Sequence, residues 1–375
     1  MSEPFIPPRL IFDCHLDISM NALEFNRDQR WTIEKIRRYE LGVNDGVPGR
    51  TRNTVSLPEL RRGRIGIIVA TQIARYVPRF GNLPGWRSPE QAWASTQGQL
   101  AYYRTMEDCG EMLQLRTWPE VEAHAARWTK ASDEDAAKLP IGYLLSLEGA
   151  DSILSWRHLE KSRADGLIAL GPVHYGPGIY GHGTDDEGPL TPKGRELLKE
   201  MERLGIILDV THYCDESFWD ALDHFSGPVW ASHHNCRALA NWNRQLTDEQ
   251  IQALIARGAV IGMAFDAIMM VHGWAHRRST PQDFGLKVEK ICEHIDHICQ
   301  LAGNTRHVGI GTDLDGGYGT EQTPMDLDTI VDILRIGEPL AKRGYQREDM
   351  IGRTTLEMGA WLSADDRMRF LAELR

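Results

Sequence analysis

Two side chains that could bind a metal ion stand close together near the start of the chain, in Phe12-Asp13-Cys14-His15-Leu16-Asp17. The apolar run over residues 10–12 predicts a short buried strand, so His15 and Asp17, two residues apart, point to one side of its end. An imidazole nitrogen and a carboxylate oxygen in that relation suit a divalent transition metal, preferentially zinc. The pair alone is weak evidence, because His-x-Asp is common by chance and more often forms a hydrogen-bonded turn.

Further metal-capable side chains follow other apolar runs. Each comes at or just after the end of a predicted strand: Glu148, His174, His212, His233 and Asp313. The carboxyl ends of the strands of a parallel barrel meet on one face, so residues scattered in sequence would converge there. Four imidazoles and three carboxylates exceed the about four ligands that one zinc takes.

Two metal ions bridged by Glu148 would use this surplus of ligands. Such a pair, about 3.5 to 4 Å apart, holds a hydroxide at neutral pH and polarises a carbonyl group at the same time. Hydrolysis is the chemistry that this arrangement suits.

Plainer interpretations exist for the members of this set taken singly. Glu148 could cap the following helix, although a carboxylate at a buried strand end is costly without a cation, which favours a metal. His212 and His233 alone would more often be hydrogen-bonded core histidines. His234 should point away from His233, and we interpret it as structural or as a neighbour of the ligands.

Other acidic and histidine pairs carry weaker signals. Asp313-Leu314-Asp315 resembles part of a calcium loop, but the spacing lacks the glutamate at the twelfth position of an EF-hand. His294 and His297 are expected on a solvent-exposed face of a helix. His272 and His276 fall in a predicted loop, where a lid role has little support.

Strands and helices alternate along most of the chain and must position these side chains. Strands are expected over residues 10–12, 65–70, 141–147, 167–173, 206–210, 228–231, 259–265 and 308–312. Helices are expected over residues 90–128 (a long one and a shorter one), 153–164, 193–204, 246–258, 283–301 and 325–375. The hydroxyl of Thr191 and the ring of Pro192 mark the start of one of them.

Eight strands separated by helices, with no linker and no break in composition, predict a (β/α)8 TIM-type barrel, with residues 1–375 as a single domain. A doubly wound open sheet is the alternative, but no glycine-rich turn follows the first strand. We interpret residues 21–63 as an insertion over the carboxyl-end face. The glycine-rich loop over residues 176–188 is predicted to be mobile and functional.

The composition excludes several classes of protein. Of the 375 residues, 42% are hydrophobic and 25% are charged, as in soluble globular proteins. The net charge of -11 and the lack of a Lys/Arg block argue against a nucleic-acid partner. No apolar run approaches the ~20 residues that span a membrane, and the first strand begins too early to leave room for a secretory signal. The six cysteines show no CxxC or framework spacing, which predicts reduced thiols in a cytoplasmic protein.

The order of the motifs resembles that of the membrane (renal-type) dipeptidase family of binuclear zinc metallopeptidases, from about residue 10 to about residue 360. The motifs are His15-x-Asp17, Leu147-Glu148-Gly149, His174, residues 189–197 (PLTPKGREL), Leu208-Asp209-Val210-Thr211-His212, Ser232-His233, residues 243–248 (NRQLTD) and residues 309–316 (GIGTDLDG). The resemblance implies a (β/α)8 barrel of the amidohydrolase kind, two Zn2+ per chain and a homodimer.

The resemblance also implies a role for each candidate ligand, position by position. His15 and Asp17 would bind one zinc ion. His212 and His233 would bind the other, and Glu148 would bridge the two ions.

Three further roles concern the substrate. By the same resemblance, His174 would contact the substrate and steady the oxyanion of the tetrahedral intermediate. Arg244 would hold the terminal carboxylate with its planar guanidinium, and Asp313 would relay a proton to the leaving amine. Without the resemblance, Arg244 would be interpreted as a surface arginine before a helix.

The expected function is zinc-dependent hydrolysis of the peptide bond of dipeptides, including L,D-dipeptides, by a metal-bridging hydroxide. A fixed cation at Arg244 would leave no space for a third residue. Two alternatives stay open: another amidohydrolase-type reaction, on a lactam, lactone or N-acyl amino acid, and a metal-binding homologue without activity. We expect a cytoplasmic homodimer that binds neither nucleic acid nor a membrane.

Overall fold

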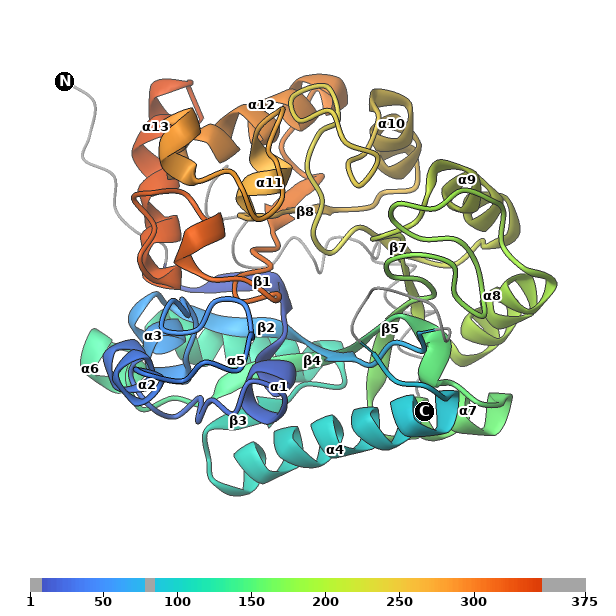
Figure 1. Cartoon of the computed structure of the whole chain (residues 1–375), viewed down its shortest axis with the longest axis horizontal. Coiled ribbons are helices and arrows are strands. Elements are labelled where there is room, and N and C mark those ends of the chain that lie inside the picture. Colours follow the sequence, from blue (N-terminus) through green and yellow to red (C-terminus); the bar gives the residue numbers. More distant parts are fainter. Residues whose placement is uncertain (1–8, 78–84, 346–375) are drawn as a thin grey trace.

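Eight parallel strands form a ring at the centre of the fold, and helices surround them on the outside (Figure 1). The computed structural model describes residues 9–77 and 85–345 of the chain. Hydrogen bonds join the strands in the order β7-β6-β5-β4-β2-β1-β9-β8. The strands are β1 (Ile11–Leu16), β2 (Ile65–Ile73), β4 (Ile141–Glu148), β5 (Leu167–Gly171), β6 (Ile207–Asp209), β7 (Val229–Trp230), β8 (Ile261–Met263) and β9 (Val308–Ile310).

The ring closes between β7 and β8. Ala231, directly after β7, pairs with Ile261 of β8 in a parallel bridge. The amide of Gly262 donates to the Ala231 carbonyl at 2.8 Å, and the amide of His234 donates to the Gly262 carbonyl at 2.7 Å. These contacts confirm the predicted (β/α)8 barrel.

One short strand lies outside the ring. β3 (Met112–Gln114) pairs with the first residues of β4. From Leu145 on, the same edge of β4 pairs with β5. The sequence predicts only helix over residues 90–128, and this prediction is wrong at β3. Three residues are too few to show the two-residue period of a strand.

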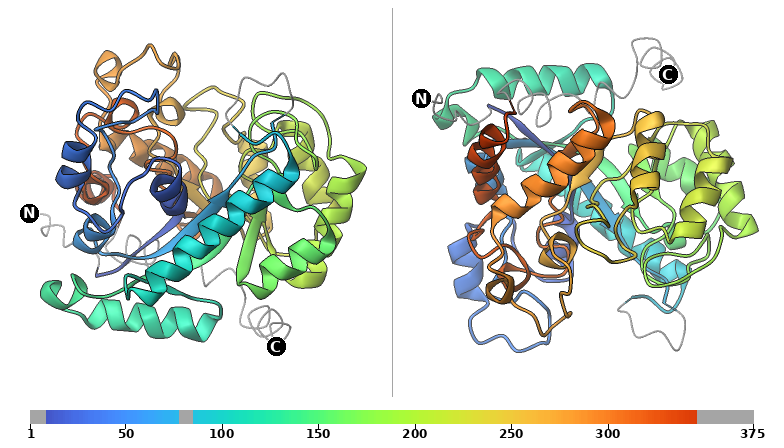
Figure 2. Two further views of the ribbon diagram at one scale, coloured as in Figure 1. Left: turned by 60° about the horizontal axis from the view of Figure 1, so that its bottom comes forward. Right: turned by 90° about the horizontal axis from the view of Figure 1, so that it is seen from above.

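Helices connect successive strands along the outside of the ring. They are α1 (Ile18–Leu23), α2 (Ile33–Tyr39), α3 (Leu57–Arg62), α4 (Pro89–Asp108), α5 (Trp118–Lys130), α6 (Asp133–Ala136), α7 (Trp156–Ala164), α8 (Pro192–Leu204), α9 (Asp215–His224), α10 (Asp248–Ala256), α11 (Ala267–Met270), α12 (Ile291–Ala302) and α13 (Gly337–Lys342). Short 3-10 segments are η1 (Ala150–Ser152), η2 (Pro281–Phe284), η3 (Val288–Lys290), η4 (Thr320–Gln322) and η5 (Ile330–Ile336). The long helix α4 lies across the outside of β2 and β3 (Figure 2). Within residues 9–77 and 85–345, no helix combines the length and the apolar character needed to cross a membrane.

Local sequence explains where several helices begin and end. At the start of α8, the Thr191 hydroxyl accepts the amide of Gly194 at 3.0 Å, as its sequence predicts. The same helix ends at Gly205, whose φ of 63° is the left-handed conformation that stops a helix. Before α10, Thr247 and Gln250 accept each other's amides through their side chains, at 3.2 and 2.8 Å.

Several helices begin later than predicted, and the predicted helices beyond residue 345 lie outside the described residues. α7 begins at Trp156 rather than at residue 153, because the chain first turns through η1 and extends at Ser155. α12 begins at Ile291 rather than at residue 283. Gly285, with a φ of 55°, ends η2 and interrupts the helix there.

α12 also buries a histidine that the sequence places on a solvent-exposed face. His294 lies among the inward-facing isoleucines of the helix and is fully buried. Its Nδ1 accepts the amide of Cys236 at 3.1 Å, and its Nε2 donates to the carbonyl of Met270 at 3.1 Å. The prediction of solvent exposure is therefore wrong for His294. His297 is partly buried, and its Nε2 lies 2.7 Å from Asp248.

Residues 21–63 pack against the loop that follows β9, at the carboxyl end of the barrel. The Asn21 side chain donates to the Asp315 carbonyl at 2.9 Å. The Asp315 carboxylate accepts the amides of Thr54 and Val55 at 2.7 and 3.0 Å. The buried guanidinium of Arg27 donates to the Asn21 side chain at 2.8 Å and to the Gly49 carbonyl at 2.7 Å, and so joins the start of this segment to its later part. These contacts place the segment on the face where the sequence predicts an insertion.

The barrel interior is narrow where β9 passes the segment after β7. A Cβ atom at Gly311 would collide with the carbonyl oxygen of Ser232. We expect Gly311→Ala to lower the free energy of unfolding by about 1–3 kcal/mol, because the backbone must move to relieve the collision. Titration with a chemical denaturant measures this change.

Gly98→Ala is the matched control for that experiment. Gly98 is exposed in α4, and no atom lies near its Cβ position. Alanine favours a helix more than glycine by about 0.5–1 kcal/mol, so the control should gain stability. Equal losses of stability in the two variants would contradict a specific collision at Gly311.

Candidate metal centre

The candidates from the sequence meet around the carboxylate of Glu148, the last residue of β4. Its Oε1 lies 3.0 Å from Nε2 of His212 and 3.4 Å from Nε2 of His233. Its Oε2 lies 3.7 Å from Nε2 of His15. The two oxygens of one carboxylate thus face histidines from different strands.

Three overlapping groups of side chains bring ligand-type atoms within 4.8 Å of one another. The groups are His15 with Asp17 and Glu148, Glu148 with His212 and His233, and His15 with His233 and Asp313. The structure therefore brings together all five residues that the sequence predicts as metal ligands. Asp313 joins them in the third group.

Two of these residues have a strained backbone. The φ angles of His212 and Asp313 are 69° and 56°, in the left-handed region that residues other than glycine seldom occupy. Such conformations cost about 1–3 kcal/mol and gather at functional sites. At both positions the chain turns sharply just after a barrel strand, which keeps the side chain at the centre.

Several atoms that face the centre lack hydrogen-bond partners. Among the described residues, Nε2 of His15, Oδ1 of Asp17 and Oε1 of Glu148 are buried without one. Each buried polar atom left unpaired costs about 1–3 kcal/mol. Divalent cations bound here would satisfy these atoms, and nitrogen and oxygen donors of this kind suit zinc. The residues present therefore fit a metal site.

Each of the three histidines in the metal-binding groups turns Nε2 toward the centre and forms a hydrogen bond with a hydroxyl group through Nδ1. The Nδ1–hydroxyl pairs are His15 with Thr71 (3.3 Å), His212 with Thr184 (3.0 Å) and His233 with Ser232 (2.9 Å). An imidazole that donates from Nδ1 keeps Nε2 deprotonated and turned toward a metal. Thr184 belongs to the glycine-rich loop over residues 176–188, so this loop reaches the centre as an orienting element.

Burial and neighbouring charges shift the pKa values of the groups at the centre. Burial raises the pKa of Glu148 to about 7 and that of Asp313 well above its usual range. Burial lowers the pKa of His15, but the carboxylates of Glu148 and Asp17 outweigh it and raise the value to about 10. The carboxylates of Glu148, Asp17 and Asp313 thus favour a positive charge at the point where the candidate ligand atoms meet. A bound divalent cation displaces protons from such a site.

His174, which follows β5, keeps a neutral imidazole. Burial lowers its pKa well below the usual range, and the positive charges of Arg75 and Arg244 lower it further. Its Nε2 lies 3.7 Å from Oε1 of Glu148, and its ring centroid lies 4.1 Å from that of His212. His174 therefore stands beside the three metal-binding groups rather than in them.

Arg244 is buried, with 2% of its surface exposed, in the segment before α10. Its guanidinium donates to the His233 carbonyl at 2.9 Å and lies 3.2 Å from the ring of His234, whose pKa burial lowers well below the usual range. In the part of the chain that the structure describes, no carboxylate forms an ion pair with it. The interpretation of Arg244 as a surface residue is wrong, and His234 is its neighbour. A buried cation without a counter-charge marks a place for an anion.

Three charged residues near the centre, Asp13, Asp209 and Arg75, were not predicted from the sequence. Asp13 accepts the hydroxyl of Thr312 at 2.6 Å, and Asp209 accepts the amide of Ser232 at 3.1 Å, so both join neighbouring strands below the ligands. Each precedes a candidate histidine by two or three residues, and that spacing could have pointed to them. Arg75 gave no signal, because β2 extends three residues beyond its predicted end.

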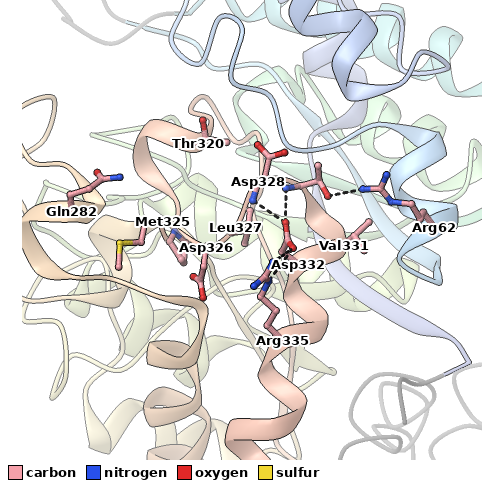
Figure 3. Close-up of a pocket in the computed structure, with 12 residues that line it drawn as sticks. Arg62, Gln282, Thr320, Met325, Asp326, Leu327, Asp328, Val331, Asp332 and Arg335 are labelled. Carbon is pink, nitrogen blue, oxygen red and sulfur yellow. Dashed lines mark hydrogen bonds and ion pairs between the residues drawn. The ribbon is translucent and has the colours of Figure 1, made fainter. Parts of the chain in front are cut away.

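A separate cavity of about 630 Å³ lies outside the barrel, beside η5 (Figure 3). None of the candidate residues lines it. Its acidic groups are occupied, since Asp332 accepts the amide of Asp328 at 2.9 Å and Nε of Arg335 at 3.0 Å. His272 and His276 are exposed and belong to none of the metal-binding groups. The chemistry of the described residues is therefore concentrated around Glu148.

A parallel barrel that gathers histidines and carboxylates at the carboxyl ends of its strands defines a metal-dependent hydrolase of the amidohydrolase kind. A sequence profile of the membrane dipeptidase family (peptidase family M19) matches residues 8–355. The chain therefore belongs to this family of metallo-dipeptidases, and the resemblance found in the motifs is confirmed.

Individual relatives agree with this assignment. An uncharacterised dipeptidase of Schizosaccharomyces pombe is 27% identical over 180 residues, which cover 47% of this chain and 41% of the relative. The crystal structure of the dipeptidase AC of family M19 is 24% identical, with a TM-score of 0.73, and covers 96% of this chain and 98% of its own. A metallopeptidase structure from Rhodobacter sphaeroides is 23% identical, with a TM-score of 0.71, over 99% of this chain and 100% of its own. Both structures share the fold, whereas the curated relatives named as dipeptidases are matched over 30% to 54% of their length.

The contact between Thr184 and His212 predicts a loss of metal affinity when the hydroxyl is removed. We expect Thr184→Val to weaken metal binding about 10- to 100-fold, because the imidazole loses the group that orients it. Competition with a chelator of known affinity measures this. The control is Thr105→Val, since the exposed Thr105 hydroxyl bonds only within α4, to the Ala101 carbonyl. Unchanged affinity in Thr184→Val, or the same loss in the control, would contradict the orienting role.

Proposed function

We propose that the protein hydrolyses dipeptides with two zinc ions held around Glu148. His15 and Asp17 bind one ion and His212 and His233 bind the other, with Glu148 between them. The division of the two Glu148 oxygens between His15 and the other histidines supports this assignment. When bound, the two ions supply an activated water and positive charge at the scissile carbonyl.

The observation that carries the proposal is the buried guanidinium of Arg244, 3.5 Å from Nε2 of His212. It needs an anion, and the terminal carboxylate of a peptide fits its planar fork through two hydrogen bonds. Because the guanidinium lies beside a proposed metal ligand, only one residue fits between that carboxylate and the bond that is cleaved. This geometry favours a dipeptide over a longer peptide.

Two further residues act on the reacting atoms. His174, kept neutral by burial and by two arginines, donates a hydrogen bond to the carbonyl oxygen as negative charge develops there. Asp313, whose pKa burial raises, accepts a proton from the attacking water and passes it to the leaving amine. Its Oδ1 lies 3.8 Å from Nε2 of His15, at the edge of the centre.

The proposed substrates include dipeptides with a D-residue at the carboxyl side. The related structure from Rhodobacter sphaeroides holds a phosphinate mimic of L-Ala-D-Ala, which supports this range. We also propose that the protein is a homodimer and lies in the cytoplasm. This is supported by the motif resemblance and by six cysteines that form no disulfide, all of them in the described residues.

Metal content and turnover, measured together, test the proposal. We expect two zinc ions per chain, hydrolysis of L,L- and L,D-dipeptides, loss of turnover on chelation and recovery with zinc. Glu148→Gln should retain fewer than two ions, because it removes the shared charge. Preferred turnover of N-acyl amino acids, lactams or lactones would replace the dipeptidase assignment with another amidohydrolase-type reaction. Two tightly bound ions without turnover of any of these would indicate a silent homologue.

Arg244→Met should raise KM for a dipeptide about 100-fold and lower kcat less, because the lost contact serves substrate and transition state alike. Steady-state kinetics on a dipeptide and on its carboxamide measure this. The carboxamide lacks the carboxylate, so the variant and the parent protein should cleave it equally well. The control is Arg203→Met, whose exposed arginine pairs with Glu160 at 2.7 Å, away from the metal-binding groups. Equal losses on both substrates in Arg244→Met would argue against carboxylate binding.

Asp313→Asn should lower kcat about 10²- to 10⁴-fold, because the amide cannot carry the proton to the leaving amine. Zinc content should stay at the parent level, and elemental analysis of the same sample checks it. Loss of an ion would instead assign Asp313 to the ligands, in line with its place in the third group. Unaltered turnover would refute the proton-transfer role.

A further inference from the structure

A second arginine stands at the rim of the barrel on the side of Glu148. β2 ends at Ile73, and Ile73 pairs in register with Glu148 of β4. Paired residues of neighbouring parallel strands point to the same side, and side chains alternate along a strand. Arg75, two residues beyond Ile73, therefore faces the same side as Glu148, one step nearer the mouth of the barrel.

Hydrogen bonds anchor the backbone at Arg75, whereas its side chain has no partner among the described residues. The amide of Trp86 donates to the Arg75 carbonyl at 2.8 Å, and the amide of Val77 donates to the Trp86 carbonyl at 2.9 Å. The side chain is partly buried. Across residues 9–77 and 85–345, nothing forms a hydrogen bond or an ion pair with its guanidinium. An anchored cation of this kind is suited to bind an anion supplied by a ligand.

Two of the acidic groups around Arg75, Glu148 and Asp151, are engaged elsewhere, and the third, Glu24, is exposed to solvent. Burial lowers the pKa of Arg75, and Glu148, Glu24 and Asp151 offset part of that effect from beyond ion-pair distance. Glu148 belongs to two of the metal-binding groups. Asp151 accepts the amide of Ile179 at 2.9 Å. The guanidinium therefore remains available to a ligand.

The strand order places Arg75 and Arg244 on opposite sides of His174. Arg75 follows β2, His174 follows β5 and Arg244 follows β7, and the strand order places β4 between β2 and β5 and β6 between β5 and β7. With the substrate carboxylate at Arg244 and the scissile carbonyl at His174, the amino-terminal residue of the dipeptide extends toward Arg75.

We propose that Arg75 is a specificity-determining residue that binds an acidic side chain on the amino-terminal residue of the dipeptide, an inference that rests on the function proposed above. An aspartate or glutamate side chain there supplies the anion that the guanidinium lacks, through two parallel hydrogen bonds. The contact is remote from the reacting atoms, so it contributes to substrate and transition state equally and is seen mainly in KM.

The test compares substrates that differ only in charge. L-Glu-L-Ala and L-Gln-L-Ala have nearly the same shape, and the parent protein should cleave the first with a kcat/KM at least about tenfold higher. L-Ala-L-Glu and L-Ala-L-Gln carry the same change on the carboxyl-terminal residue. Their kcat/KM values should differ by less than about twofold. L-Ala-L-Ala reports dipeptidase activity without an acidic side chain.

Three variants assign any preference to Arg75. Arg75→Met should lower kcat/KM for L-Glu-L-Ala to the value that the same variant shows for L-Gln-L-Ala, and the change should lie in KM. Arg75→Lys should keep a reduced preference, because it retains the charge but not the planar fork. Arg104→Met is the control, since Arg104 pairs with Asp165 on the exposed side of α4.

The outcomes separate this inference from the proposed function. Turnover of L-Ala-L-Ala with equal kcat/KM for L-Glu-L-Ala and L-Gln-L-Ala overturns the role of Arg75 and leaves the dipeptidase intact. If Arg75→Met lowers kcat/KM equally for both substrates, the arginine has a structural role, and the proposed specificity role is overturned. If the zinc-loaded parent protein cleaves no dipeptide, the proposed function fails and the inference fails with it.

Discussion

The buried carboxylate of Glu148 is the constraint on which the rest of the site depends. Only 8% of the residue is exposed, and the imidazoles of His15, His212 and His233 lie 3.0 to 3.7 Å from its two oxygens. A carboxylate withdrawn from water in this way is stable only beside positive charge. Burial lowers the pKa values of His212 and His233 well below the usual range, so these two supply lone pairs rather than charge. His15, whose pKa the carboxylates raise, supplies one positive charge, and bound metal cations would supply the rest, in line with a family of metallopeptidases.

Barrel strands and the segments that follow them fix the position of this carboxylate and of the histidines around it. Glu148 ends a strand that is hydrogen-bonded along both edges, and the groups that orient the histidines come from other strands or from the segments that follow them. The hydroxyls of Thr71 and Ser232 hold imidazoles from one side, and Asp13 and Asp209 join the strands below. Ligand positions that depend on so many strand contacts vary little, and a metal centre needs such fixed positions.

Recognition of the substrate is assigned to a different part of the molecule. The candidate ligands lie in barrel strands or within three residues of their ends. Arg244 lies in the longer segment between β7 and α10, and Arg75 lies two residues after β2. Segments of this kind can differ between proteins without disturbing the strands that carry the metal ligands. On this view, the metal centre defines the class of reaction, and the positions of the two guanidinium groups define which dipeptides the protein accepts.

The sequence by itself determined the alternation of strands and helices and the residue types at the strand ends, because both follow from local periodicity. That was enough to predict the barrel and to select His15, Glu148 and the other candidates that the structure brings together. Local patterns did not reveal that His294 is buried or that Thr184 reaches His212, since those contacts join distant segments. Only the tertiary structure decided which hydroxyl holds which imidazole and which arginines lack an anionic partner. The physical reason is that hydrogen bonds and burial depend on neighbours in space, and the chain acquires those neighbours only when the barrel closes.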